Sequence, residues 1–130
     1  MFTGAVLADE IAQTPNVSAG VVTFEPGART AWHSHPGGQI VHALRGVGRV
    51  QAAGGEVYEL TPGDTAVCPP GERHWHGAGP DRLFVQLAVQ ASGPPGEAGA
   101  AWFDHVSDEE YSRPAVAVRD AERSGEASSD

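Results

Sequence analysis

The chain has 130 residues, 40% of them hydrophobic, and its 17 acidic residues against eight basic ones give a formal net charge of −9 at pH 7. This length suits a single domain with a hydrophobic core, and the negative charge argues against nucleic acid or an anionic membrane surface as a partner. The chain has no lysine, which excludes a Schiff-base lysine mechanism, and its one cysteine, Cys68, cannot form an internal disulfide, so we expect a soluble protein of the reducing cytoplasm.

Short strands separated by turns are expected through most of the chain. Runs of β-branched and apolar residues between Gly- and Pro-rich turns predict strands over residues 20–25, 31–35, 39–44, 46–51, 56–60, 65–68, 74–77 and 83–90. Strands at such regular intervals, with no helix-forming segment among them, indicate a sandwich or a barrel. We therefore expect residues 1–90 to form an all-β barrel core.

The character of the sequence changes after the last expected strand, where a Gly- and Pro-rich loop begins. Ser107, followed by three acidic residues, resembles a helix start, because a serine N-cap and acidic residues in the first turn both favour one. We expect residues 91–118 to form a loop and a short helix that pack on the barrel. The polar residues 119–130 are expected to form a flexible tail.

Three histidines and one glutamine have the spacing of a metal site. His33 and His35 are two residues apart in an extended segment, so both rings point to the same side of a sheet. Gln39 returns to that side after a turn, and His74 comes from a second strand. Such clustering favours a metal site over unrelated surface or core histidines. Nitrogen and oxygen donors without a thiolate suit Mn, Fe, Ni, Cu or Zn, and the donors alone do not choose among these metals.

Gln39 leaves two alternatives open, since it either ligates the metal or lies beside it. Ligation is the alternative that we favour, although an amide oxygen is a weaker donor than a carboxylate. Three neutral imidazoles and a neutral amide leave the charge of a divalent ion uncompensated. The ion should therefore bind less tightly than in a site with Glu, and should be a stronger Lewis acid.

His76 lies two positions after His74 and should face the same cavity, while Trp75 between them points away. Three roles compete for this residue: an additional metal ligand, a general acid/base beside the metal, or a structural hydrogen-bonding group. We favour the acid/base role, because an imidazole is the usual proton carrier near neutral pH.

The last expected strand carries two amides on one face. Gln86 and Gln90 share this face, and on a mostly apolar strand they need partners if they are buried. A cavity with a polar ligand would supply those partners, whereas a face turned to solvent would not need them, and both alternatives stay open. Val22, on an early strand, is expected to be an apolar wall of the cavity, and Cys68 a buried inert thiol.

These segments resemble the two conserved motifs of the cupin superfamily. The first motif is matched in its spacing by Gly27, His33, His35, Gln39 and Gly46, and the second by Gly63, Pro69, Gly71 and His74. Gln39 stands where the family usually has Glu, and Ala78 stands where it has Asn. The resemblance implies a cupin-type double-stranded β-helix, which is a jelly-roll barrel.

A narrower resemblance is to small single-domain bacterial cupins, a group that includes manganese-dependent (R)-selective hydroxynitrile lyases. It is carried by residues 22–35, 71–78 and 102–111 and by the glutamine in the first motif. The resemblance implies a divalent metal, with Mn as the first choice, and a homodimer. The residues that it assigns are His33, His35, Gln39 and His74 as metal ligands, His76 as the acid/base of the cavity, and Gln90 as a pocket residue that orients the nitrile. One departure is Gln86, where the lyases have a second histidine.

Three functions remain as hypotheses for such a site. The first is a Lewis-acid lyase of the hydroxynitrile type that acts on a small molecule, and a metal-assisted isomerase or decarboxylase would use the same residues. The second is an iron(II) dioxygenase, since three histidine ligands with open positions can also activate O₂. The third is a non-catalytic cupin that binds a small metabolite.

Overall fold

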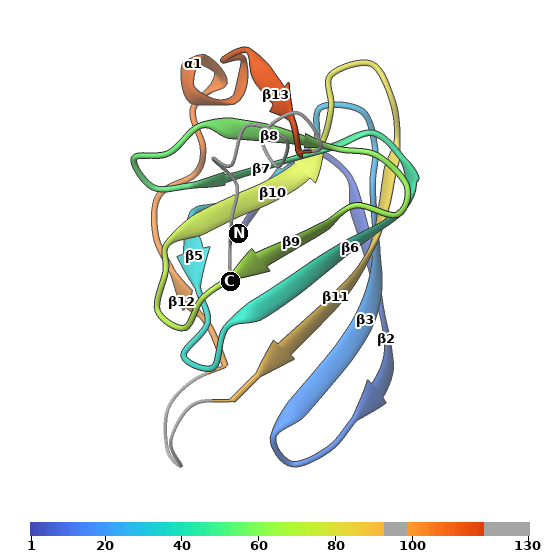
Figure 1. The fold of residues 1–130 in the computed structure, drawn as a ribbon, viewed down its shortest axis with the longest axis vertical. Coiled ribbons are helices and arrows are strands. Elements are labelled where there is room, and N and C mark those ends of the chain that lie inside the picture. The colour runs from blue at the N-terminus through green and yellow to red at the C-terminus, as the bar shows by residue number, and fades with distance from the viewer. Residues whose placement is uncertain (93–98, 119–130) are drawn as a thin grey trace.

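Two β-sheets face each other in this computed structural model, which describes residues 1–92 and 99–118 (Figure 1). The elements among these residues are β1 (Phe2–Thr3), β2 (Val6–Gln13), β3 (Val17–Phe24), β4 (Arg29–Thr30), β5 (His33–Ser34), β6 (Gln39–Gly46), β7 (Gly48–Ala52), β8 (Val57–Leu60), β9 (Thr65–Cys68), β10 (His74–Ala78), β11 (Phe84–Ala91), β12 (Ala101–Trp102), α1 (Asp108–Tyr111) and β13 (Ala115–Ala117). The predicted all-β class with one short C-terminal helix is confirmed. The tail expected over 119–130 lies outside the described residues.

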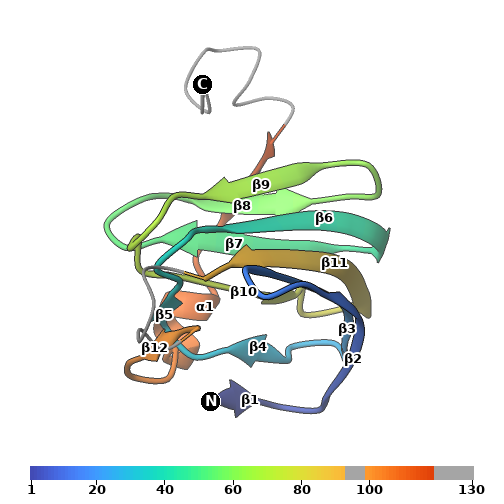
Figure 2. The ribbon, with the colours of Figure 1, turned by 90° about the horizontal axis from the view of Figure 1, so that it is seen from below.

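The order of the strands places the site between the sheets. The smaller sheet runs β2-β3-β11-β6-β9, and the larger one runs β1-β4-β10-β7-β8-β13, with β5 paired to β10 and β12 paired to β5 (Figure 2). On β11, Gln86 lies opposite Val22 of β3. Four residues further on, Gln90 lies between Ser18 of β3 and Gln39 of β6. This register brings polar residues from three strands to one inner face.

Two strands near the N-terminus differ from the sequence prediction. Strand β2 was not predicted, because its run of Ala, Asp, Glu and Gln has little intrinsic preference for extended structure. It forms because it pairs antiparallel with most of β3 at the edge of the smaller sheet. Of the strand expected over 31–35, only the two residues of β5 are in a strand, and a second short strand, β4, lies just before that range; both pair with β10.

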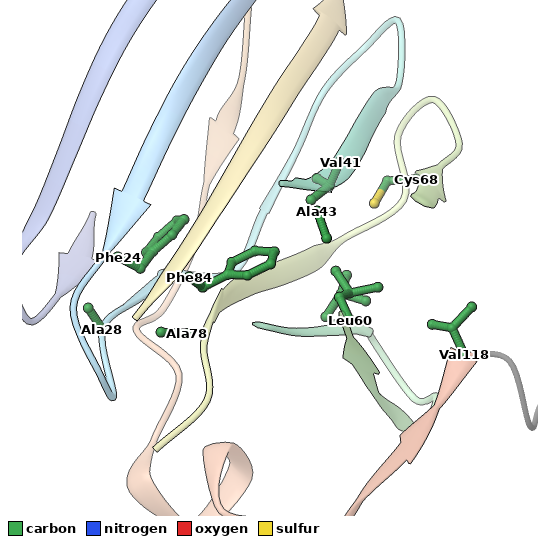
Figure 3. Packing of buried hydrophobic residues seen from close by; sticks show 10 residues of the cluster. Phe24, Ala28, Val41, Ala43, Leu60, Cys68, Ala78, Phe84 and Val118 are labelled. Carbon is green, nitrogen blue, oxygen red and sulfur yellow. The ribbon is translucent and has the colours of Figure 1, made fainter. Parts of the chain in front are cut away.

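The main hydrophobic core fills the space between the sheets beside the site. Its buried members are Phe24, Ala28, Val41, Ala43, Val50, Leu60, Cys68, Ala78, Phe84 and Val118 (Figure 3). Phe24 of β3 and Phe84 of β11 are fully buried and stack with their ring centroids 6.4 Å apart. Burying a side chain of this size contributes about 1.5–3 kcal/mol. Phe24 also meets the ring of His76 edge-on at 6.0 Å, so the core and the site share a wall.

Gly46, the last residue of the first motif, is required by the backbone. Its φ is +77°, a region that favours glycine, and a Cβ atom there would overlap the carbonyl oxygen of Leu83. This motif glycine therefore allows the end of β6 to lie against the start of β11.

Residues 106–111 of the C-terminal segment pack on the face of the larger sheet that is turned away from the histidines, where Val106 and Tyr111 contact Trp75. Ser107 caps α1 and forms a capping box with Glu110, as its sequence predicts. Arg29 of β4 holds the segment, because its Nη2 donates to the carbonyl oxygen of Val106 at 2.9 Å and to the carboxylate of Asp108 at 2.8 Å. No helix in the described part of the chain is long and apolar enough to cross a membrane.

Candidate metal centre

Two neighbouring strands of the larger sheet supply the histidines. His33 of β5 lies directly opposite His74 of β10 in the antiparallel register. Side chains alternate along β10, so His74 and His76 point between the sheets. Trp75 points the other way, where it is fully buried and its Nε1 donates to Oε1 of Gln51 at 2.8 Å.

The rings of four histidines gather within a few ångströms of one another. One ring nitrogen each of His33, His74 and His76 lies within 4.8 Å of the others, which makes these three a group that could hold a metal ion. The ring centroid of His35 lies 5.1 Å from that of His33 and 6.0 Å from that of His74. The structure thus brings the predicted ligands together and adds His76 to them.

The three motif histidines share one hydrogen-bond pattern that fixes their tautomer. In each of them, Nδ1 donates to a backbone carbonyl oxygen. The acceptors are Ala31 for His33 at 2.9 Å, Gly99 for His35 at 2.8 Å and Glu72 for His74 at 3.0 Å. A neutral imidazole that donates from Nδ1 has its lone pair on Nε2, and this arrangement is typical of metal-bound histidines.

Gln39 presents an oxygen, not an NH₂ group, to these lone pairs. Its Nε2 donates to Oε1 of Gln90 at 3.0 Å, and Nε2 of Gln90 donates to Oγ of Ser18 at 2.7 Å. Gln39 Oε1 therefore faces His74, with 2.8 Å between the oxygen and Nε2. Because Nδ1 already holds the proton of a neutral His74, two acceptors face each other. A bound cation would reconcile this contact, and so would a turn of both amides that brings Nε2 of Gln39 to His74; the nitrogen and oxygen donors gathered here suit a divalent metal.

Burial keeps these imidazoles neutral. Desolvation lowers the pKa of His33 to about 4, and desolvation together with the charge of His33 lowers the pKa of His74 to about 3. Desolvation also lowers the pKa of His35, and it lowers that of His76 well below the usual value. At neutral pH the lone pairs are free to bind a metal, with no proton to displace.

A cavity of about 480 Å³ opens onto the cluster. The predicted site residues that line it are Val22, His33, His35, Gln39, His76, Gln86 and Gln90. His74 is 1% exposed and lies behind them. The sequence did not identify Thr30, Phe24 or Trp102 as lining residues, because their places depend on pairings between distant strands. Trp102 lies opposite His33 in the β5–β12 pair, which no spacing motif indicates.

The face of β11 that carries the two amides is turned into the cavity, so the alternative of a solvent-facing surface is wrong. Gln86 is fully buried, yet neither of its amide atoms has a hydrogen-bond partner among the described residues. Neither ring nitrogen of His76 makes a well-aligned hydrogen bond there, and a weak hydrogen bond between this ring and the Gln86 amide opposes the lowering of the His76 pKa. Gln90 differs, since both ends of its amide are engaged by Gln39 and Ser18.

Comparisons with known proteins agree with this geometry. The sequence profile of the cupin domain family matches residues 20–86. The chain is 48% identical over 115 residues to a protein of Granulicella tundricola named (R)-mandelonitrile lyase, with 86% of each chain covered.

Two solved structures resemble the fold closely. A cupin-like protein from Thermotoga maritima is 41% identical, with a TM-score of 0.78 over 85% of this chain and 84% of that one. A protein with a double-stranded β-helix domain from Klebsiella pneumoniae is 29% identical, with a TM-score of 0.63 over 78% of this chain and 86% of that one.

Proposed function

Because this chain belongs to the cupin family and gathers neutral imidazoles around an open cavity, we propose that it is a metal-dependent lyase that cleaves and forms cyanohydrins. The single observation that carries the proposal is the cluster of ring nitrogens of His33, His74 and His76, which lie within 4.8 Å of one another beside the Gln39 oxygen. The relative named (R)-mandelonitrile lyase supports this activity over the others that such a site allows.

The residues that would hold the metal are His33, His35, Gln39 and His74. When bound, a divalent ion would supply Lewis acidity that stabilises negative charge on a substrate oxygen. Manganese is our first choice, and Fe, Zn, Ni or Cu would suit the same donors. Nε2 of His35 is buried without a hydrogen-bond partner in the described part of the chain, which is the state expected of a metal ligand.

His76 is assigned to proton transfer rather than to metal binding. No backbone carbonyl of the described residues accepts from its Nδ1, in contrast to the three motif histidines, so these residues do not fix its tautomer. In cleavage, the neutral ring would take the hydroxyl proton of the cyanohydrin as the C–C bond breaks. The bonding electron pair leaves with cyanide, which takes the proton from His76, and the products are an aldehyde and HCN. Synthesis is the reverse.

The size and lining of the cavity suit such a substrate. A volume of about 480 Å³ lies within the usual range for small-molecule sites, and the walls combine apolar side chains with polar groups that could orient a ligand. The ring of Phe24 and the side chain of Val22 offer apolar surface to an aryl or alkyl group.

Metal analysis combined with mandelonitrile cleavage tests the proposal. Protein purified without a His-tag should contain close to one Mn per chain by mass spectrometry and should release benzaldehyde from mandelonitrile. His35→Ala should lose the metal and the activity, whereas His76→Ala should keep the metal and lose most of the activity. The control is His105→Ala, which removes an exposed histidine outside the cavity and should change neither.

Three other results would contradict the proposal. Iron in the site together with substrate-dependent oxygen uptake would support a dioxygenase. Little metal in the wild type, unchanged by His35→Ala, would support a binding module without catalysis. Full activity of His76→Ala would remove the role assigned to that residue.

A further inference from the structure

Gln86 is a buried amide in the wall of a cavity. Its side chain is fully buried, neither Oε1 nor Nε2 makes a well-aligned hydrogen bond among the described residues, and its one polar neighbour there is the ring of His76. A buried polar group left poorly paired is destabilising, so few proteins keep one without a use for it. A ligand in the cavity would provide the missing partners, because Gln86 lines that cavity.

Gln90, four residues further along the same face of β11, shows what a structural amide looks like in this protein. Its Oε1 accepts from Gln39 and its Nε2 donates to Ser18, so both ends are engaged within the fold. Gln90 therefore holds Gln39 in place, and Gln86 is the amide that remains available to a bound molecule.

The surroundings of Gln86 limit what that molecule can be. Val22 lies opposite it on β3, and Ala43 lies opposite it on β6, so neither neighbouring strand offers a polar side chain at this level. The polar group that interacts with Gln86 is the ring of His76, which shares the cavity wall and makes no other side-chain hydrogen bond among the described residues. Together, the amide and the ring offer both hydrogen-bond donors and acceptors, and a ligand that satisfies them needs a hydroxyl group and a separate acceptor close to it.

The charged side chains around the cavity favour a neutral acceptor beside Gln86. They are Asp9 and Glu10, and no arginine is among the lining residues. The one positive charge would be that of the proposed metal ion, which would act on the hydroxyl oxygen of the substrate. A carboxylate at Gln86 would find no cationic side chain to pair with. A nitrile or a carbonyl group needs only a donor, which Nε2 of Gln86 supplies.

We infer that Gln86 sets the substrate specificity of the site by donating from Nε2 to the neutral acceptor of an α-hydroxy nitrile or α-hydroxy carbonyl compound. The inference rests on the proposed function for the identity of the reaction, but not for the binding itself. It gives Gln86 the role of orienting the nitrile, which the family resemblance assigns to Gln90.

The variant Gln86→Met tests this role, because methionine keeps the length of the side chain and removes its hydrogen bonds. The unpaired amide disappears, so the melting temperature of the variant should equal or exceed that of the wild type. The metal content should not change. The dissociation constant for mandelamide, a hydroxy amide that cannot lose cyanide, should rise about tenfold in calorimetric titration of the Mn-loaded protein. Benzyl alcohol, which lacks the acceptor, should bind both proteins equally.

A matched control is Gln13→Met, which makes the same chemical change at an exposed position outside the cavity and should alter none of these values. Equal mandelamide binding by the wild type and Gln86→Met would overturn the inference, and so would failure of the wild type to bind mandelamide. A marked fall in melting temperature would also overturn it, because the amide would then have a structural role. Binding that depends on Gln86 in a protein without lyase activity would support the inference and refute only the proposed function.

Discussion

Gln90→Met is expected to weaken metal binding although Gln90 does not touch the metal site's histidines. Gln39 is 6% exposed, and its Nε2 donates to Oε1 of Gln90 at 3.0 Å. Without this acceptor, two outcomes are open to Gln39. Its NH₂ group can stay in place, buried and unpaired, or its amide can turn over so that the NH₂ group points at Nε2 of His74. The first outcome costs about 1–3 kcal/mol, and the second replaces a metal donor with a group that cannot bind a cation. Either outcome should weaken Mn binding roughly 10–100-fold, as is typical of residues that orient metal ligands.

Titration of metal-free protein with Mn²⁺, followed by the electron paramagnetic resonance of free Mn²⁺, measures this affinity directly. Gln86→Met is the matched control, because it makes the same change on the same face of β11 at a residue that does not contact Gln39. Its Mn affinity should equal that of the wild type. Wild-type affinity in Gln90→Met would refute the reasoning, since the orientation of Gln39 would then not depend on Gln90, or Gln39 would not be a ligand.

Four further predictions concern stability, reactivity and assembly. Burial raises the pKa of Cys68 to about 12, so the thiol stays protonated at about pH 8. Mass spectrometry should therefore find iodoacetamide on Cys68 only after unfolding in urea. Labelling of the native protein would contradict this. Arg29→Met should lower the free energy of unfolding, measured by urea titration, by about 1–3 kcal/mol, because the carbonyl oxygen of Val106 loses its donor. Asp108→Asn should have a much smaller effect, because the Asp108 carboxylate is exposed. Equal effects of the two variants would be inconsistent with this account. Gly77→Ala should lower the free energy of unfolding by about 1–3 kcal/mol, because the new Cβ would overlap the backbone of β4. An unchanged melting temperature would show that β10 and β4 can move apart without loss of stability. The homodimer implied by the family resemblance stays a prediction, and light scattering during size-exclusion chromatography should give about twice 13.5 kDa, with a monomer mass as the opposing result.

The sequence alone determined the fold class and the family, because both can be recognised from the spacing of residues that lie close together in the chain. Turn residues recur between short β-branched runs, and this spacing predicted strands joined by tight turns. The N-cap at Ser107 followed from its own side chain and the acids after it, and the structure confirms it. The spacing of His33 and His35 required both rings to share a face, since a strand repeats every two residues. Which of these residues hold a metal remains a prediction.

Tertiary structure decided which partners the side chains on one face of a strand have. Spacing made Gln86 and Gln90 equivalent. Only the pairing of β11 with β3 and β6 shows that Gln39 and Ser18 engage Gln90, whereas no residue of these two strands bonds the amide of Gln86. The same holds for β2, which is a strand because β3 offers it a hydrogen-bonding edge, and for Trp102, which meets His33 only across β12 and β5. A sequence fixes the side of a strand on which a residue lies. The residue that lies opposite is set by register between strands far apart in the chain, and hydrogen bonds, burial and chemical availability depend on that neighbour.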